Sequence, residues 1–262
     1  MMDRALLLVA LACYLAPMFA REGGRLQMLA ARWWVPAGIL LHVQGLIVAF
    51  VVHDVPLRSM SEGLGLTALV VVLAREWWGR RPRMLVLRRI LLALTSLLLA
   101  LAALAPRGQG TGDGMSTFFL LHIGLVLTGF AGFALTFSMS TLYLVVRRRL
   151  KAKRLSEIGT LPSLETLDSL IIRTMAFGFI TLSAGIAVGV AWAISGGGRI
   201  APGDLTTVLT AAVWLWYAAG LMARLAIGWR GRVVAMFGVG GFIAFLLITG
   251  VGLLVSGWHR VI

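Results

Sequence analysis

The chain has 262 residues, of which 60% are apolar and only 13% are charged, and its formal net charge is +14. A soluble domain is about half apolar and about a quarter charged, so this composition excludes a soluble enzyme, a disordered tail and a disulfide-stapled secreted module. It predicts an all-α integral membrane protein, with a single transmembrane domain over residues 1–262.

Apolar runs separated by short basic stretches predict about eight transmembrane helices, because one bilayer span takes about 20 apolar residues. The predicted spans cover residues 5–20, 33–52, 57–74, 90–105, 118–146, 169–194, 205–223 and 233–256. The fifth would be about 44 Å long at about 1.5 Å per residue, against a hydrocarbon core of about 30 Å. We therefore expect its outer end, near residues 115–122, to project from the membrane.

The basic residues predict how the helices are oriented. If the N-terminus lies outside, most of the 24 lysines and arginines fall on the inner side. The outer side keeps only Arg4, Arg58, Arg107, Arg199 and Arg260. Cytoplasmic loops carry the excess of Lys and Arg, so we expect both termini outside. Because orientation explains the positive net charge, nucleic-acid binding is disfavoured. The basic run 147–154 is expected to orient helices and to touch anionic lipid headgroups.

Three local features are interpreted as structural. The GxxxG spacing at 185–189 would let a neighbouring helix approach closely. Pro162, followed by Glu165 and Asp168, predicts the start of the sixth helix, with acidic groups near the positive end of its dipole. Cys13 is the single cysteine, and it is expected only to pack.

The carboxylates offer little chemistry inside the membrane. All ten Asp and Glu residues fall in loops or at span ends, whereas proton-coupled carriers usually place a carboxylate at mid-membrane. The sequence also has no P-loop, HExxH or GxSxG motif that would indicate a hydrolytic enzyme.

The four histidines are the candidate ligands. His42 falls near the middle of the second span, and His53 follows about three turns later on the same face, at the outer end. His122 begins the fifth span and His259 follows the eighth, so both are expected at the outer surface. Neutral imidazole is a good axial ligand for haem iron, and without HxxxH or cysteine partners zinc is disfavoured. Hydrogen bonding between helices is the alternative role for each histidine.

Four segments carry a resemblance to a known family. They are His42 with His53, Pro56, Ser59 and Glu62; FLLHI around His122; LPSLETLD at 161–168; and WLWYAAGLMAR with GWRGR and GWH between 214 and 259. They resemble the cytochrome c assembly proteins, the CcsA- and CcmC-like haem-handling membrane proteins, and in particular the HemX-like eight-helix branch.

The resemblance implies a haem-binding protein of c-type cytochrome maturation in the bacterial inner (cytoplasmic) membrane. Haem b would be its cofactor, and other membrane proteins of cytochrome maturation would be its partners. His42 would be the intramembrane ligand, His122 and His259 the outer axial pair, and His53 a neighbour of the outer site. Met222 stands where the family has a second intramembrane histidine; a thioether can also ligate haem iron, although packing is the more common role of methionine.

Two departures from the family change the expected activity. The tryptophan-rich outer motif W-x-W-D-x-K-E is reduced to Asp204 within 201–207, and Met222 replaces the second intramembrane histidine. The sequence also has no CxxC thiol pair. We therefore expect a protein that supports maturation rather than an autonomous haem lyase or a catalyst. Two alternatives stay open: a regulatory or scaffold protein of the same fold without haem, acting on tetrapyrrole synthesis or a membrane complex, and a small-molecule transporter.

Overall fold

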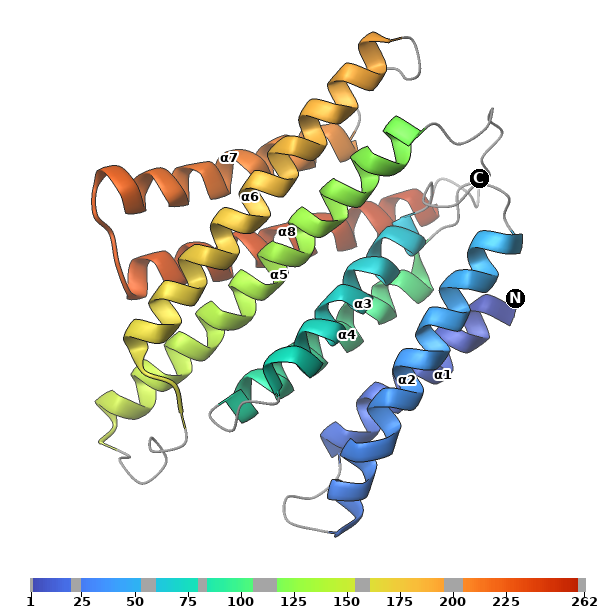
Figure 1. Cartoon of the computed structure of the whole chain (residues 1–262), viewed down its shortest axis with the longest axis horizontal. Coiled ribbons are helices and arrows are strands. Elements are labelled where there is room, and N and C mark those ends of the chain that lie inside the picture. The colour runs from blue at the N-terminus through green and yellow to red at the C-terminus, as the bar shows by residue number, and fades with distance from the viewer. Residues whose placement is uncertain are drawn as a thin grey trace. The chain divides into compact units, whose positions relative to one another are not determined.

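The computed structural model describes residues 2–19, 25–52, 60–79, 84–105, 117–153, 161–195 and 205–258. Within these ranges the chain forms eight helices and no strand, which confirms the all-α prediction (Figure 1). The helices are α1 (Met2–Phe19), α2 (Arg25–Val52), α3 (Met60–Gly79), α4 (Leu85–Leu104), α5 (Thr117–Lys151), α6 (Leu164–Ile194), α7 (Leu205–Ala226) and α8 (Arg232–Trp258). Each overlaps one of the predicted apolar runs.

Four of the described helices are long and apolar enough to cross a membrane: Trp33–Val51 within α2, and the whole of α4, α5 and α6. Shorter apolar stretches occupy Arg4–Met18 of α1 and Arg232–Leu247 of α8. These lengths and compositions are those of a multi-pass membrane protein. The full count of eight crossings and the outer position of both termini stay predictions.

The fifth helix extends further at its basic end than the apolar pattern predicts. α5 has 35 residues and ends at Lys151 instead of near 146. Its last turn carries Arg148, Arg149 and Lys151, and cations near a helix C-terminus interact favourably with the helix dipole. The length of an apolar run therefore underestimates the length of a helix whose last turn is stabilised by charged residues.

The sixth helix begins at Leu164, five residues before the predicted apolar run, because a cap precedes it. Ser163 is in an extended conformation, and its hydroxyl oxygen accepts a hydrogen bond of 3.1 Å from the backbone N–H of Thr166. Such a cap satisfies one of the free donors of the first turn. Pro162 lies just before the cap, so the predicted helix start is confirmed within a few residues.

The chain divides into two compact units, each described by itself. The first comprises Met1–Trp77 and Leu91–Gly114, which include α1, α2 and most of α3 and α4. Within it α1 packs closely on α2, since a Cβ atom added at Gly38 would lie 2.7 Å from Cε1 of Tyr14. Cys13, beside the same glycine, is a buried free thiol.

The second unit, Trp78–Ile90 and Met115–Ile262, contains α5 to α8. In it α5 and α6 lie side by side (Figure 1). A Cβ atom added at Gly132 of α5 would lie 2.7 Å from Cα of Gly178 on α6. Next along the same contact, the Thr136 hydroxyl donates to the Thr174 hydroxyl oxygen across 3.0 Å. Backbone contact through glycine and hydrogen bonds between small polar residues are typical of packed membrane helices.

Aromatic residues attach α7 to the α5–α6 pair and to α8. The indole N–H of Trp214 donates to the Ser183 hydroxyl on α6 at 2.8 Å, and the Tyr217 ring stacks on Phe133 of α5 with centroids 3.7 Å apart. On the other side, the indole N–H of Trp216 donates to the backbone oxygen of Phe237 on α8 at 3.0 Å. The tryptophan-rich start of the WLWYAAGLMAR segment therefore packs the second unit together.

Candidate functional site

His122 of α5 is held in one orientation by the neighbouring helix. Its Nδ1 atom lies 2.7 Å from the backbone oxygen of Gly185 on α6. A carbonyl oxygen can only accept, so Nδ1 carries the proton and donates. In the neutral ring the lone pair then lies on Nε2, which is the tautomer that a metal-ligating histidine uses when its other nitrogen bonds a backbone carbonyl.

Gly189 makes room for this imidazole. A Cβ atom added there would lie 2.5 Å from Nδ1 and 2.6 Å from Cε1 of His122. Gly185 allows a close contact between the two helices next to it, because its added Cβ would lie 2.8 Å from Cγ2 and 3.0 Å from the backbone nitrogen of Val126. The close helix approach predicted from the GxxxG spacing is thus confirmed, and the spacing also creates the seat for the His122 ring, which the sequence pattern did not reveal.

Aromatic side chains lie one turn from His122 on both helices. The rings of Phe119 on α5 and Trp192 on α6 have centroids 5.4 Å apart and an interplanar angle of 55°. His122 itself is only partly buried, so its ring can be reached from outside the helix pair. A partly exposed imidazole beside aromatic rings is the kind of surface that a flat, apolar ligand can use.

His42 of α2 lies in a different environment, inside the first unit. It is fully buried, and its Nδ1 atom lies 3.3 Å from the hydroxyl oxygen of Tyr14 on α1. Its Nε2 atom faces the backbone of Gly65 on α3 but makes no hydrogen bond of ordinary length within the described residues. Most buried polar atoms are hydrogen-bonded, so an unpaired imidazole nitrogen is a candidate for ligand binding.

The remaining predicted site residues differ in what the structure says of them. His53 and His259 lie outside the described residues. Met222 lies on α7 with 61% of its surface exposed. His42 and His122 belong to different units, so the convergence of histidines from several helices stays a prediction.

Conventional metal clusters are absent from the described part of the chain, where no three His, Cys, Asp or Glu side chains come together. The candidate ligands in this part are therefore single imidazoles. Haem suits such residues, because the porphyrin supplies four ligands and the protein adds only axial ones.

A third feature connects two of the segments that carry the family resemblance. Asp168, the last residue of LPSLETLD, accepts from Nη2 of Arg224 at 2.9 Å and from the backbone N–H of Gly231 at 2.8 Å. Arg224 also donates through Nη1 to the backbone oxygen of Trp229 at 3.1 Å. We call these residues the Asp168 clamp. It joins the start of α6 to the turn between α7 and α8, and in the sequence Asp168 was interpreted only as a dipole-stabilising group.

Gly231 is the residue in the clamp that no other amino acid can easily replace. Its φ angle is +65°, a left-handed conformation that favours glycine. An added Cβ would also lie 2.7 Å from the hydroxyl oxygen of Tyr143 on α5. The GWRGR segment is therefore fixed on one side by Asp168 and on the other by α5.

The fold and these sites define a multi-pass helical membrane protein with isolated imidazoles held on its helices. The chain matches the family model of the cytochrome C assembly protein over residues 4–259. It therefore belongs to the cytochrome c assembly family, and the resemblance inferred from the sequence is confirmed.

Three relatives illustrate the similarity. The cytochrome c biogenesis protein CcsA of Synechococcus sp. (strain CC9605) is 29% identical over 171 residues, which are 55% of this chain and 56% of that protein. CcsA of Synechococcus sp. (strain CC9902) is 31% identical over 172 residues with the same coverage. CcsA of Guillardia theta is 29% identical over 161 residues, 55% of this chain and 54% of that protein. The chain spans about half the length of these relatives. No solved structure matches it.

Proposed function

We propose that this protein binds haem in the bacterial inner membrane and supports the maturation of c-type cytochromes, together with other membrane proteins of that process. The observation that carries the proposal is the imidazole of His122, whose Nδ1–H is bonded to the Gly185 carbonyl and whose Nε2 lone pair is available. Membership of the cytochrome c assembly family supports the same function. Eight membrane crossings with both termini outside belong to the proposal.

Haem is a suitable ligand for the imidazole of His122. Haem iron takes a neutral imidazole nitrogen as an axial ligand, and a second-sphere hydrogen bond from Nδ1–H to a backbone carbonyl fixes the ring and raises its basicity. Haem would be the cargo, the iron porphyrin that c-type cytochromes carry. In the proposal His259 is the second axial ligand of the outer site, with His53 as its neighbour.

His42 is the proposed intramembrane ligand. Its Nε2 atom is buried and unpaired within the described residues, and the Tyr14 hydroxyl can hold the other nitrogen at 3.3 Å. If Nδ1–H donates to the tyrosine oxygen, the Nε2 lone pair is available for iron. Met222 has the weaker claim as a thioether ligand, since 61% of its surface is exposed and methionine in membrane helices mostly packs.

The proposed role is support or relay, without autonomous haem attachment. The tryptophan-rich motif of the family is reduced to Asp204, so the residues that would present haem to an acceptor are missing from this sequence. The single cysteine also provides no thiol pair to reduce an apocytochrome.

Haem binding is tested with His122→Ala in the purified protein. We expect the haem Soret band per protein to weaken, with affinity at the outer site falling by more than about tenfold, because iron loses an axial ligand. His259→Ala should match it, and a His42→Ala/His122→Ala double variant should lose the remaining pigment. Leu121→Ala, which removes a half-exposed neighbour on the same helix, should keep wild-type absorbance.

Other outcomes would replace the proposal. A colourless wild-type protein, with histidine variants that behave as wild type, would favour a regulatory or scaffold role of the same fold. Substrate flux into vesicles without any pigment would favour a transporter.

The seat at Gly189 gives a second prediction. In Gly189→Ala the new methyl group collides only with the His122 ring, so the ring should turn away and lose its bond to Gly185 while the helices stay packed. Loss of such a second-sphere contact is expected to weaken haem binding by about 10-fold to 100-fold. Gly124→Ala on α5, where an added Cβ meets nothing within 4 Å, is the control. Unchanged haem affinity in Gly189→Ala with an unchanged unfolding temperature would contradict this role.

A further inference from the structure

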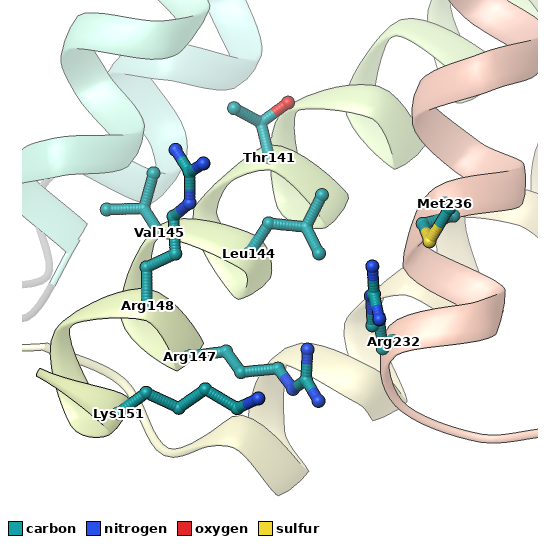
Figure 2. A pocket seen from close by; sticks show the side chains of 8 residues that line it. All are labelled: Thr141, Leu144, Val145, Arg147, Arg148, Lys151, Arg232 and Met236. Carbon is teal, nitrogen blue, oxygen red and sulfur yellow. The ribbon is translucent and has the colours of Figure 1, made fainter.

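A pocket of about 600 Å³ lies between the basic end of α5 and the start of α8, at the opposite end of α5 from His122. Its lining residues are Thr141, Leu144, Val145, Arg147, Arg148, Lys151, Arg232 and Met236. Figure 2 shows the side chains of Arg147 and Lys151 extending from α5 toward Arg232 on α8, with Leu144 and Met236 on either side of the space between the helices.

Positive charge in this pocket is not balanced by the described part of the protein. Four of the eight lining residues are cationic and none is acidic. Asp168 bonds Gly231, the residue before Arg232. Both of its carboxylate oxygens are already used, one by Gly231 and the other by Arg224. Within the described residues, no carboxylate forms a salt bridge with any of the four cations. Such a cluster repels itself unless an anion binds, and it attracts one.

The pocket also has an apolar side. Leu144, Val145 and Met236 contribute hydrocarbon, and 51% of the Met236 surface is exposed. Both lining helices continue from here as apolar segments, α5 through its long span and α8 through Leu247. A ligand with an anionic head and a hydrocarbon tail would therefore satisfy both sides, whereas a small free anion would leave the apolar side exposed to water.

The Asp168 clamp makes this a built site rather than a flexible charged loop. Gly231 is fixed by its bond to Asp168 and by its left-handed conformation, and Arg232 is the next residue and the first of α8. Arg232 is thereby held at the positive end of the α8 dipole, which adds to the attraction for an anion. Across the pocket, Arg147, Arg148 and Lys151 come from the last turns of one continuous helix.

We propose that this pocket binds the phosphate headgroup of an anionic phospholipid, with an acyl chain along Leu144 and Met236. Basic pockets between transmembrane helices are known to take such headgroups. The sequence expectation is that the run 147–154 orients helices and touches anionic headgroups at the membrane surface. A defined pocket goes beyond it, because Arg232 joins the run from 80 or more residues further along the chain. The proposal is independent of haem binding at the histidines.

The test is a titration of the detergent-purified full chain with phosphatidylglycerol, phosphatidylcholine or inorganic phosphate, with bound lipid counted by native mass spectrometry. We expect phosphatidylglycerol to bind in preference to phosphatidylcholine, and inorganic phosphate to compete only weakly. Each cation near a membrane surface contributes about fivefold in affinity for anionic lipid. Arg147→Gln/Arg232→Gln should therefore lower phosphatidylglycerol affinity by about 25-fold.

Two further variants keep the test decisive. Lys151→Gln, an exposed position in the last turn of α5, should fold normally and lower the affinity by about fivefold. Arg230→Gln removes an exposed cation that does not line the pocket and should bind as wild type. Equal loss in Arg230→Gln and Lys151→Gln would overturn the assignment, since it would indicate nonspecific attraction to net charge. Inorganic phosphate or haem that displaces phosphatidylglycerol at equal concentration would also overturn it and assign the pocket to a free anion or to haem.

Discussion

Replacing Gly132 with leucine is expected to prevent recovery of a folded protein in detergent. The Cβ atom alone would lie 2.7 Å from Cα and 2.9 Å from the backbone nitrogen of Gly178, so the clash is with backbone that no side-chain rotation can relieve. The two helices must separate, which also breaks the hydrogen bond between Thr136 and Thr174. Overpacking alone costs about 1–3 kcal/mol, against a total stability of about 5–15 kcal/mol. Because the hydrogen bond between α5 and α6 is lost as well, we expect the free energy of unfolding to fall by more than about 3 kcal/mol.

The control for this prediction is Gly124→Leu, eight residues earlier on the same helix. An added Cβ at Gly124 meets nothing within 4 Å, so the same chemical change should leave the unfolding temperature nearly unchanged. The measurement is the elution profile and thermal unfolding of the two variants side by side. A monodisperse Gly132→Leu protein that unfolds at the wild-type temperature would show that α5 and α6 do not pack through these glycines.

The eight helices could be predicted from the sequence because the signal is local: an apolar run bounded by arginines needs no knowledge of the fold. Helix ends were less predictable for an equally physical reason. Ser163 starts α6 and Lys151 ends α5 through capping and dipole interactions, which lie outside the apolar pattern.

The sequence predicted a candidate ligand at the site, but it did not predict how that residue is held. His122 could be singled out as a ligand, but its orientation depends on Gly185 and Gly189, which are more than 60 residues away along the chain. A GxxxG spacing predicts that some helix approaches closely without indicating which one. The convergence of His122 with His259 depends likewise on the order of helices in the membrane plane, which span positions do not contain.

Asp168 shows the same limit most clearly. Its position in the first turns of α6 explains an acidic residue through the helix dipole, and that local explanation is sufficient from sequence. The actual partners, Arg224 and Gly231, lie 56 and 63 residues further on. A motif that resembles a family can therefore owe its residues to a tertiary contact that holds helices in place.

Removal of this contact in Asp168→Ala is expected to cost at least about 3 kcal/mol of stability. Hydrogen bonds to charged groups contribute about 1.5–3 kcal/mol each, and Asp168 accepts two. The side chains of Asp168 and Arg224 are only 15% and 19% exposed, so Arg224 would be left largely buried without its counter-charge. The turn before α8 should also become a substrate for trypsin at Arg230 and Arg232, since nothing then bonds the Gly231 N–H.

Glu165→Ala is the matched control, because Glu165 is exposed, lies one turn earlier on α6 and carries the same charge. Its loss should cost less than about 1 kcal/mol, the size of a dipole interaction at a helix N-terminus. Arg224→Ala should destabilise less than Asp168→Ala, because the bond from the Gly231 N–H to Asp168 remains. The double variant should cost less than the sum of the two single variants, because both single variants remove the Asp168–Arg224 pair. Additive losses and an unchanged trypsin pattern would contradict the clamp. Since Arg232 directly follows the clamped glycine, Asp168→Ala should also weaken phosphatidylglycerol binding, whereas Glu165→Ala should not.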